Sequence, residues 1–257
     1  MRSILHQSIG LSDLSVDPTK FIVQADQPPT MQNADKRYPA CLLFLLSRFC
    51  KKMINTFTTN AGIDSGAADV YGVVVVTIFS VPDFRWNGIS LIDIFWAKYH
   101  RVCPPLFGIS GSETTAAGKA RLGWWQDDSG FFDQADHYQR MTGLASGFAA
   151  LTLRDFSKSK NPNPAPNRLW WESMARILNL RQGEVQATHC VIVEAMISDQ
   201  VPRIMQIFAS AGKAALRKAT VEFPEKAPKA PSGRPIDVAQ KLKNLRDRMQ
   251  KEHGLVL

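Results

Sequence analysis

The sequence predicts an all-α fold, an irregular HEAT-repeat-like stack of antiparallel helix pairs. Two observations support this prediction. Apolar residues recur at the 3.6-residue period of a helix in most segments, and short turns separate successive segments of this kind. The clearest pair spans His137–Leu180, where a Pro/Asn-rich corner at Asn161–Pro166 divides two apolar helix patterns. The pairs differ in length and no fixed repeat is visible, so the predicted stack is irregular.

The first half of the central pair carries an apolar stripe embedded in small residues. Its members are Met141, Leu144, Phe148, Leu151 and Phe156. Glycine inside a helix costs about 0.5–1 kcal/mol relative to alanine. The Gly- and Ala-rich run from Gly143 to Ala150 therefore indicates close approach by another helix.

The second half of the pair begins after the proline corner, where Asn167 is expected to cap a helix. The inner stripe of this helix runs from Trp170 to Leu178, and Asn179 stands where it should stop. Neighbours on a helix point about 100° apart, so the two adjacent tryptophans cannot face one core. We expect Trp170 to be buried, and Trp171 to be partly exposed or packed against the corner.

The N-terminal third contains a lead-in and two helices. Residues 1–37 are expected to be poorly ordered, with only Phe21–Val23 docking on the core; the helical domain spans residues 38–257. Its first helix runs from Tyr38 to about Thr59. Ala67–Val81 is ambiguous because it is rich in β-branched residues. We interpret it as a fully buried helix, since the flanking helices offer no sheet for a strand to join.

Further helices are expected along the rest of the chain. They are interrupted by an acidic, mobile segment at Gln126–Asp128 and by a Pro/Lys-rich linker at residues 224–235. The predicted ranges are Asn87 or Ser90 to Val102, Glu113–Trp124, Glu184–Asp199, Pro202–Val221 and Ile236–Glu252.

Composition places the chain among intracellular globular proteins. Of its 257 residues, 45% are hydrophobic and 21% are charged, which is ordinary for such a protein. No apolar run approaches the roughly 20 residues of a membrane helix, and the N-terminus lacks a secretory signal pattern. The four cysteines show no CxxC spacing, so we expect reduced, mostly buried thiols in cytosol or nucleus.

Catalysis is disfavoured. The sequence has no HExxH, Walker, GxGxxG or GxSxG motif, and its five histidines are dispersed without metal-ligand spacing. Asp127 and Asp128 are adjacent in a polar segment, where carboxylates seldom converge on one substrate atom. We therefore predict a protein that is not an enzyme.

Positive charge marks two regions. The net charge is +8, and much of it lies between Lys213 and Glu252, where a solvated helix face competes with binding to RNA or an acidic partner. The second region is divided between two predicted helices, one with Lys51 and Lys52, the other with Lys98 and Arg101. If these helices pack side by side, their cations suit a small polyphosphate, because charge-assisted bonds to phosphate are strong.

Several motifs resemble the C-terminal domain of the GLFG-lethal ("Gle-one") mRNA export factor family, fungal type. In chain order they are Gln27-Pro-Pro, Ser90–Phe95 running to Cys103-Pro104, Arg121–Trp125, Arg140–Gly143, Trp170-Trp171 and Ala175–Asn179. The resemblance covers roughly Gln24 to Leu257. It implies a HEAT-like fold and a nuclear-pore protein that activates a DEAD-box RNA helicase.

The resemblance also implies inositol hexakisphosphate as a ligand that bridges the domain to the helicase. Carried over by position, family basic residues fall on Lys51, Lys98 and Arg101. Lys52 and His100 are weaker candidates by proximity. Two further family positions are uncharged here, Val102 and Asn55, which would weaken the site.

The predicted function is a non-enzymatic regulator of mRNA export at the cytoplasmic face of the nuclear pore. Its expected partners are the helicase and a nucleoporin, with mRNA contacted only indirectly and no membrane. A HEAT-like RNA-binding scaffold and a purely structural nucleoporin adaptor remain as alternatives.

Overall fold

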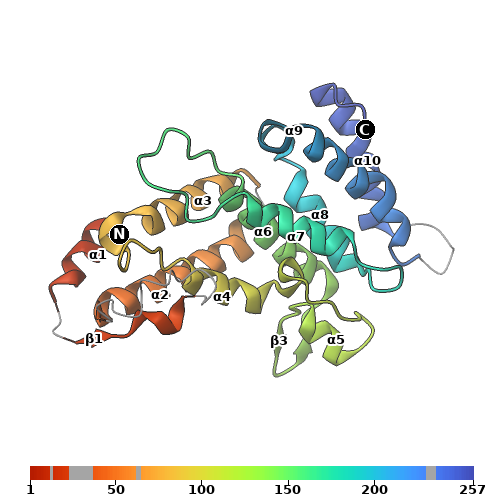
Figure 1. Cartoon of the computed structure of the whole chain (residues 1–257). Helices are drawn as coiled ribbons and strands as arrows, with labels where there is room; N and C mark the ends of the chain where they lie inside the picture. The colour runs from red at the N-terminus through yellow and green to blue at the C-terminus, as the bar shows by residue number, and fades with distance from the viewer. Residues whose placement is uncertain (12–13, 23–36, 62–64, 230–235) are drawn as a thin grey trace.

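The computed structural model of the chain describes residues 1–11, 14–22, 37–61, 65–229 and 236–257. Most of this part is helical, which confirms the all-α prediction (Figure 1). The α-helices are α1 (Arg2–Ile9), α2 (Ala40–Thr56), α3 (Ser65–Ser80), α4 (Asp93–Val102), α5 (Ala116–Arg121), α6 (Gln134–Thr152), α7 (Arg168–Leu178), α8 (Ala187–Ile197), α9 (Val201–Arg217) and α10 (Asp237–His253).

Short turns and two small antiparallel strand pairs connect these helices. The 3-10 turns are η1 (Pro18–Phe21), η5 (Pro82–Phe84), η6 (Pro104–Phe107) and η8 (Phe223–Lys226), and the π-turns are η4 (Phe57–Ala61) and η7 (Lys218–Glu222). The strands β1 (Ser15–Val16) and β2 (Tyr38–Pro39) pair antiparallel, as do β3 (Gln126–Asp127) and β4 (Gly130–Phe131). HEAT-like stacking of the helix pairs stays a prediction.

Helix α6 runs through the middle of the molecule and is the centre of the core. It packs against α3 and η4 on one side and against α8 on another (Figure 1). A Cβ added to Gly147 would lie 2.5 Å from a ring carbon of Phe57, and one added to Gly72 of α3 would lie 3.2 Å from Ala150. The small residues of α6 therefore allow close approach, as the sequence predicts.

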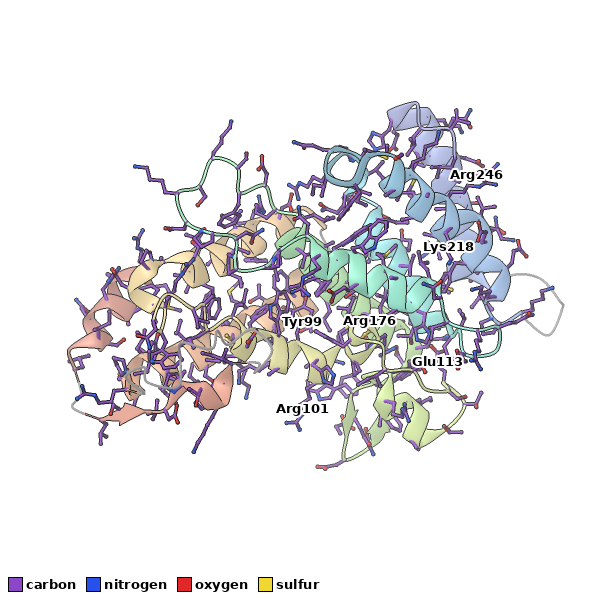
Figure 2. The ribbon with its side chains drawn as sticks, in the orientation of Figure 1. Tyr99, Arg101, Glu113, Arg176, Lys218 and Arg246 are labelled. Atoms are coloured by element: carbon purple, nitrogen blue, oxygen red, sulfur yellow. The ribbon has the colours of Figure 1, made fainter. Side chains whose placement is uncertain are left out.

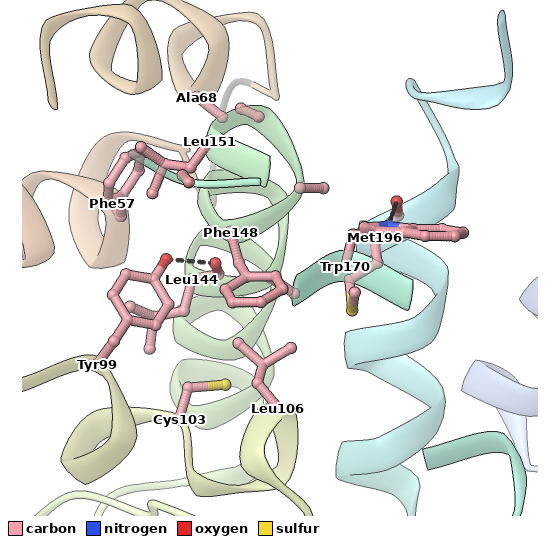
Figure 3. Packing of buried hydrophobic residues seen from close by; sticks show 14 of the residues in the cluster. Phe57, Ala68, Tyr99, Cys103, Leu106, Leu144, Phe148, Leu151, Trp170 and Met196 are labelled. Atoms are coloured by element: carbon pink, nitrogen blue, oxygen red, sulfur yellow. Dashed lines mark hydrogen bonds between the residues drawn. The ribbon is translucent and has the colours of Figure 1, made fainter. Parts of the chain in front are cut away.

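The two tryptophans of α7 behave as predicted. Trp170 is fully buried, and its indole N–H donates to the carbonyl of Met196 in α8 (Figure 3). Trp171 is 37% exposed and packs on Phe208 of α9. Asn167 differs from the prediction: it stands at the N-cap position, but its side chain makes no capping hydrogen bond.

The N-terminal lead-in is more structured than expected. Within residues 1–37, the described part contains α1, which packs on α2 and buries Leu5 completely. Strand β1 then pairs with β2, and Ile22 is buried while Phe21 is 43% exposed. Val23 and the rest of that stretch, 24–36, lie outside the described residues. Helix α1 is held in position because one of its sides is buried against α2. This contact cannot be predicted from composition.

Three other expectations are corrected in detail. Helix α3 is a helix and not a strand, but it is not fully buried, because Val70, Val73 and Val74 are exposed. The segment expected to be acidic and mobile forms the β3–β4 hairpin, in which the Asp127 carboxylate accepts two hydrogen bonds from Ser129. The helix expected over residues 202–221 is kinked at Ala209, where φ is +47°.

The C-terminal region completes the core. Helix α10 packs on α8 and η7 and buries an apolar stripe that includes Leu242 and Met249. The predicted linker begins as η8, and residues 230–235 lie outside the described part. None of the helices in the described ranges is long and apolar enough to cross a bilayer.

Candidate functional site

The predicted ligand residues lie on α2 and α4, and these two helices pack against each other. The apolar side of α4 faces the core, where Ile94, Phe95 and Tyr99 are buried. Its polar side therefore faces outward, and Arg101 projects from the end of the helix into solvent (Figure 2). Two grooves border the α2 and α4 surfaces.

The first, which we call groove A, has a volume of about 510 Å³. Its lining residues are Arg48, Lys51, Lys52, Ile54, Asn55, Thr58, Val102, Trp125 and Arg140. Four of them are cations and none is a carboxylate. Lys51 and Lys52 come from the exposed side of α2, one turn before Asn55. Groove A is therefore a basic depression with an apolar wall.

The second, groove B, has a volume of about 490 Å³ and is less uniformly basic. It is lined by Lys20, Phe21, Ile22, Leu43, Ser47, Asp93, Ile94, Ala97, Lys98 and Arg101. Ser47 lines groove B and the next residue, Arg48, lines groove A; Arg101 and Val102 are divided in the same way. The two grooves therefore lie on different sides of α2 and of the end of α4.

The structure divides the predicted site residues between these grooves. Lys51 and Lys52 line groove A, while Lys98 and Arg101 line groove B. His100 lines neither, because its ring packs 5.0 Å from the ring of Phe107. The predicted single pocket is thus two neighbouring depressions, and the contribution of each residue to ligand binding stays a prediction.

Groove A has no carboxylate in its lining, whereas groove B includes Asp93. Arg48, Lys51, Lys52, Lys98 and Arg101 form no ion pair with a carboxylate among the described residues. The thiol of Cys50 does not supply a negative charge in place of a carboxylate, because burial raises its pKa to about 12. Lys98 has the opposite, smaller influence on this pKa. The surface around α2 and α4 can therefore attract an anion from solution.

Arg140 and Trp125 belong to groove A, although sequence reasoning did not place them there. One guanidinium nitrogen of Arg140 donates to the carbonyl of Gly123 at 2.6 Å, and the guanidinium lies 5.8 Å from the Trp125 ring. Burial lowers the pKa of Arg140. Both residues lie in motifs that carry the family resemblance, but nothing in the sequence places α6 and the β3–β4 hairpin beside α2.

A separate polar cluster joins α6, α8 and the loop before α5. His137 Nε2 lies 2.9 Å from the hydroxyl of Thr188, which donates to the carboxylate of Glu113 at 2.5 Å. The His137 ring stacks on Trp124, and burial lowers its pKa to about 3, with Arg140 and Lys119 adding to the shift. Thr188 is fully buried, so its hydroxyl is not presented to a substrate.

We interpret this cluster as a set of structural hydrogen bonds that hold α6, α8 and the loop before α5 together. Among the described residues, no group of three or more His, Cys, Asp or Glu side chains is arranged to hold a metal ion. The basic grooves are therefore the stronger candidate for function.

Comparison of sequences identifies relatives of the chain. Residues 11–220 match the GLE1-like protein family. The mRNA export factor GLE1 of Chaetomium thermophilum is 41% identical over 231 residues, which is 89% of this chain and 44% of that protein. The mRNA export factor GLE1 of Saccharomyces cerevisiae is 25% identical over 125 residues, 47% of this chain and 23% of that protein. This chain thus spans less than half the length of either relative.

Comparison of structures shows the same fold in a known complex. A chain from the S. cerevisiae Dbp5 C-terminal domain bound to Gle1 and IP6 matches with a TM-score of 0.71, at 19% identity, over 84% of this chain and 71% of that one. The same complex with a Gle1 variant gives a TM-score of 0.71 at 18% identity, with equal coverage. Both sequence relatives are named for mRNA export and not for a reaction. The chain belongs to the GLE1-like protein family.

Proposed function

We propose that this chain is a non-enzymatic mRNA export factor that binds a DEAD-box RNA helicase, with inositol hexakisphosphate as the bridging ligand. The observation that carries the proposal is groove A, in which four cations line a depression that has no carboxylate in its lining. Exposed cations are usually interspersed with acidic partners, so this arrangement favours a highly charged anion.

The ligand fits the chemistry of the groove. Inositol hexakisphosphate is a compact ring with phosphates on every side, so it can accept hydrogen bonds from several directions at once. Arg48, Lys51 and Lys52 would hold it from α2, and Arg101, which lines the neighbouring groove B, would reach towards it from the end of α4. Lys98 also lines groove B and would add electrostatic attraction.

The grooves also suit a bridging role. Both lie on the surface, so a ligand held there leaves part of its phosphates open to a second protein. In the related S. cerevisiae complex, Gle1, the Dbp5 C-terminal domain and IP6 are present together. We infer that a helicase of the same kind docks over the ligand on this chain.

Activation follows if the chain prefers one conformation of the helicase. A ligand shifts a conformational equilibrium only by its difference in affinity for the two states. Preference for the open helicase would favour RNA release and speed the ATPase cycle. The place of action would be the cytoplasmic face of the nuclear pore, where a nucleoporin is a further partner by resemblance.

A helicase ATPase assay tests the proposal. The rate would be measured with the helicase alone, with this chain, with inositol hexakisphosphate, and with both. Stimulation that requires both additions is the expected result. An unchanged rate despite binding of a partner would favour the structural nucleoporin adaptor instead.

Direct RNA binding by the basic C-terminal region is less well supported. Several of its cations are already paired, with Lys243 2.7 Å from Glu225 and Arg248 3.7 Å from Glu252. A scaffold that binds RNA through phosphates would lose affinity steeply with salt and would not need an inositol phosphate. Either behaviour would contradict the proposed function.

A further inference from the structure

A third groove lies where the first turns of α6, α8 and α10 come together. It consists of two adjoining hollows of about 850 Å³ and 220 Å³, which share Tyr138, Val238 and Lys241 in their linings. Most of its other lining residues fall within 133–142, 186–194 and 236–241, and Glu113 closes one end. We call this continuous depression groove C.

Groove C lies on the other side of α6 from groove A. Helix α6 contributes Tyr138 to groove C and Arg140 to groove A, and residues two apart on a helix point about 200° away from each other. Figure 1 likewise shows α8 and α10 on one side of α6 and α2 on the other. A molecule bound in groove C therefore leaves grooves A and B open.

The charge of groove C is opposite to that of the chain. Glu113, Asp133 and Asp237 line the larger hollow and Glu194 lines the smaller one, whereas Lys241 is the single cation in either lining. The chain as a whole carries +8. None of these four carboxylates forms an ion pair within the described residues. Groove C therefore attracts cations and repels the phosphates of a nucleic acid.

One of these carboxylates is fixed before any partner binds. The Oε1 atom of Glu113 accepts hydrogen bonds from the backbone N–H and the hydroxyl of Thr188, at 2.7 Å and 2.5 Å. The backbone N–H of Glu113 in turn donates to the side chain of Gln186 at 3.1 Å. A cation that meets Glu113 therefore costs little additional side-chain entropy.

The floor of groove C is apolar. Tyr138, Ile236 and Val238 are only partly buried there, and Val191 of α8 lies beneath them in the smaller hollow. An apolar side chain of a partner can cover this floor. The long stems of lysine and arginine can at the same time carry their charges to the acidic rim. This combination fits a peptide segment better than a metal ion or a small polar cation.

We propose that groove C docks a short extended segment of a partner protein, in which basic side chains flank an apolar residue. The apolar contact supplies affinity, and the carboxylates select a basic partner. The inference goes beyond the proposed function, because no residue that lines groove A or groove B also lines groove C. It gives the chain a second docking surface across α6.

Nuclear magnetic resonance titration of the whole chain tests the proposal. The probe is the capped pentapeptide Lys-Leu-Lys-Leu-Lys, and the control is Glu-Leu-Glu-Leu-Glu, which keeps the apolar residues and reverses the charge. We expect the basic probe to shift the amide resonances of residues 134–142, 187–194 and 236–241 in a saturable way. The amides of α2 at Lys51 and Lys52 should not move, and the acidic peptide should shift neither set.

Charge-neutral variants show whether the carboxylates of groove C cause this binding. Asp237→Asn and Glu194→Gln should each weaken the basic peptide about two- to five-fold, the range of an exposed ion pair. Val238→Thr keeps the shape of the floor but adds a hydroxyl, and it should also weaken binding. The matched control is Asp247→Asn, an exposed carboxylate of the same helix that does not line groove C. Its affinity should match wild type.

Three results would overturn the proposal. They are the absence of saturable shifts in groove C, an equal response to the acidic peptide, and an equal loss of affinity in Asp247→Asn and Asp237→Asn. Thermal melting of each variant reports on the fold. If one variant fails to fold, the other variants and the two peptides on wild type still decide the outcome.

Sedimentation velocity distinguishes a partner protein from a second copy of this chain. The proposal expects one species at all protein concentrations in the absence of peptide. A dimer that grows with concentration and is dissociated by Asp237→Asn would assign groove C to a second copy, and it would overturn the proposal.

Discussion

The phenol of Tyr99 in α4 donates a hydrogen bond to the backbone carbonyl of Leu144 in α6, with 2.5 Å between the oxygens (Figure 3). Tyr99 is completely buried, and burial raises its pKa well above the ordinary value. The bond joins the helix that carries Lys98 and Arg101 to the central helix. The position of the basic residues on α4 thus depends on a contact inside the core.

Removal of this hydroxyl should destabilise the protein. Tyr99→Phe should lower the free energy of unfolding by about 1 kcal/mol, because a buried hydrogen bond is lost without a replacement from water. Urea denaturation measures the difference. Tyr138→Phe is the matched control, since the Tyr138 hydroxyl accepts from Gln134 in an exposed pair and its loss should stay within about 0.5 kcal/mol. Equal effects of the two changes would contradict this account of the α4–α6 contact.

The two adjacent tryptophans should differ in their importance for stability. Trp170→Ala should cost about 3–5 kcal/mol, because it leaves a cavity among α7, α8 and α9. Trp171→Ala should cost clearly less, since its ring is 37% exposed. Thermal or chemical unfolding of both variants gives the comparison. An unchanged stability of Trp170→Ala would show that α7 does not pack as described.

Stability should fall in mild acid. Burial lowers the pKa of His137 to about 3 and that of His189 to about 4, below the value of about 6.5 for an unfolded chain. The unfolded state therefore binds more protons as the pH falls from about 6.5 towards 4. Each histidine can add a slope approaching about 1.4 kcal/mol per pH unit in that window.

Histidine replacements identify the source of this slope. Unfolding free energies between pH 7 and pH 4.5 should depend less on pH in His137→Gln and in His189→Gln than in wild type. His100→Gln is the control, because the His100 side chain is exposed on α4 and its replacement removes no buried imidazole. If His100→Gln flattened the profile as much as the buried variants, burial would not explain the acid sensitivity.

Charge changes in the two grooves should have unequal effects on ligand affinity. Lys51→Met should weaken inositol hexakisphosphate binding about ten- to a hundred-fold, because one charge-assisted contact is lost. Val102 lines groove A, so Val102→Lys should strengthen binding and Val102→Asp should weaken it. Lys98→Met should have a smaller effect, since Lys98 lines groove B.

Lys241 provides the background level for these titrations, because it is exposed on α10 and attraction between distant exposed charges is screened within about 10 Å at ordinary salt. Lys241→Met should therefore change the affinity little. If its loss equalled that of Lys51→Met, the grooves would be only part of a diffuse basic surface.

Much of the fold could be predicted because helical periodicity is a local property of the sequence. The apolar stripe through Met141 and Leu144 predicts which side of α6 faces the core. The adjacent tryptophans predict the same for α7. Helix α3 could be assigned only by asking what a strand would pair with. Its exposed side, at Val73 and Val74, could not be foreseen, because that depends on which neighbouring helix covers it.

The site was less predictable because grooves are made by tertiary packing. The sequence placed Lys51 and Arg101 on helices that do pack together, yet the depressions between elements divide these residues. The place of Arg140 in groove A could not be predicted, since its contact with the turn at Gly123 joins residues that are 17 positions apart. The acidic composition of residues 126–128 predicts a mobile segment, whereas hydrogen bonds from Ser129 to Asp127 stabilise the β3–β4 hairpin there.

The burial of α6 links ligand binding to the rate at which the protein is degraded in the cell. Since this helix contacts the core along most of its length and also carries Arg140, occupancy of groove A would be linked to unfolding of the whole domain. A ligand at a hundred times its Kd stabilises the native state by about 2.7 kcal/mol. Turnover by proteases follows the unfolded fraction, so the amount of this protein would depend on the supply of whichever ligand binds groove A.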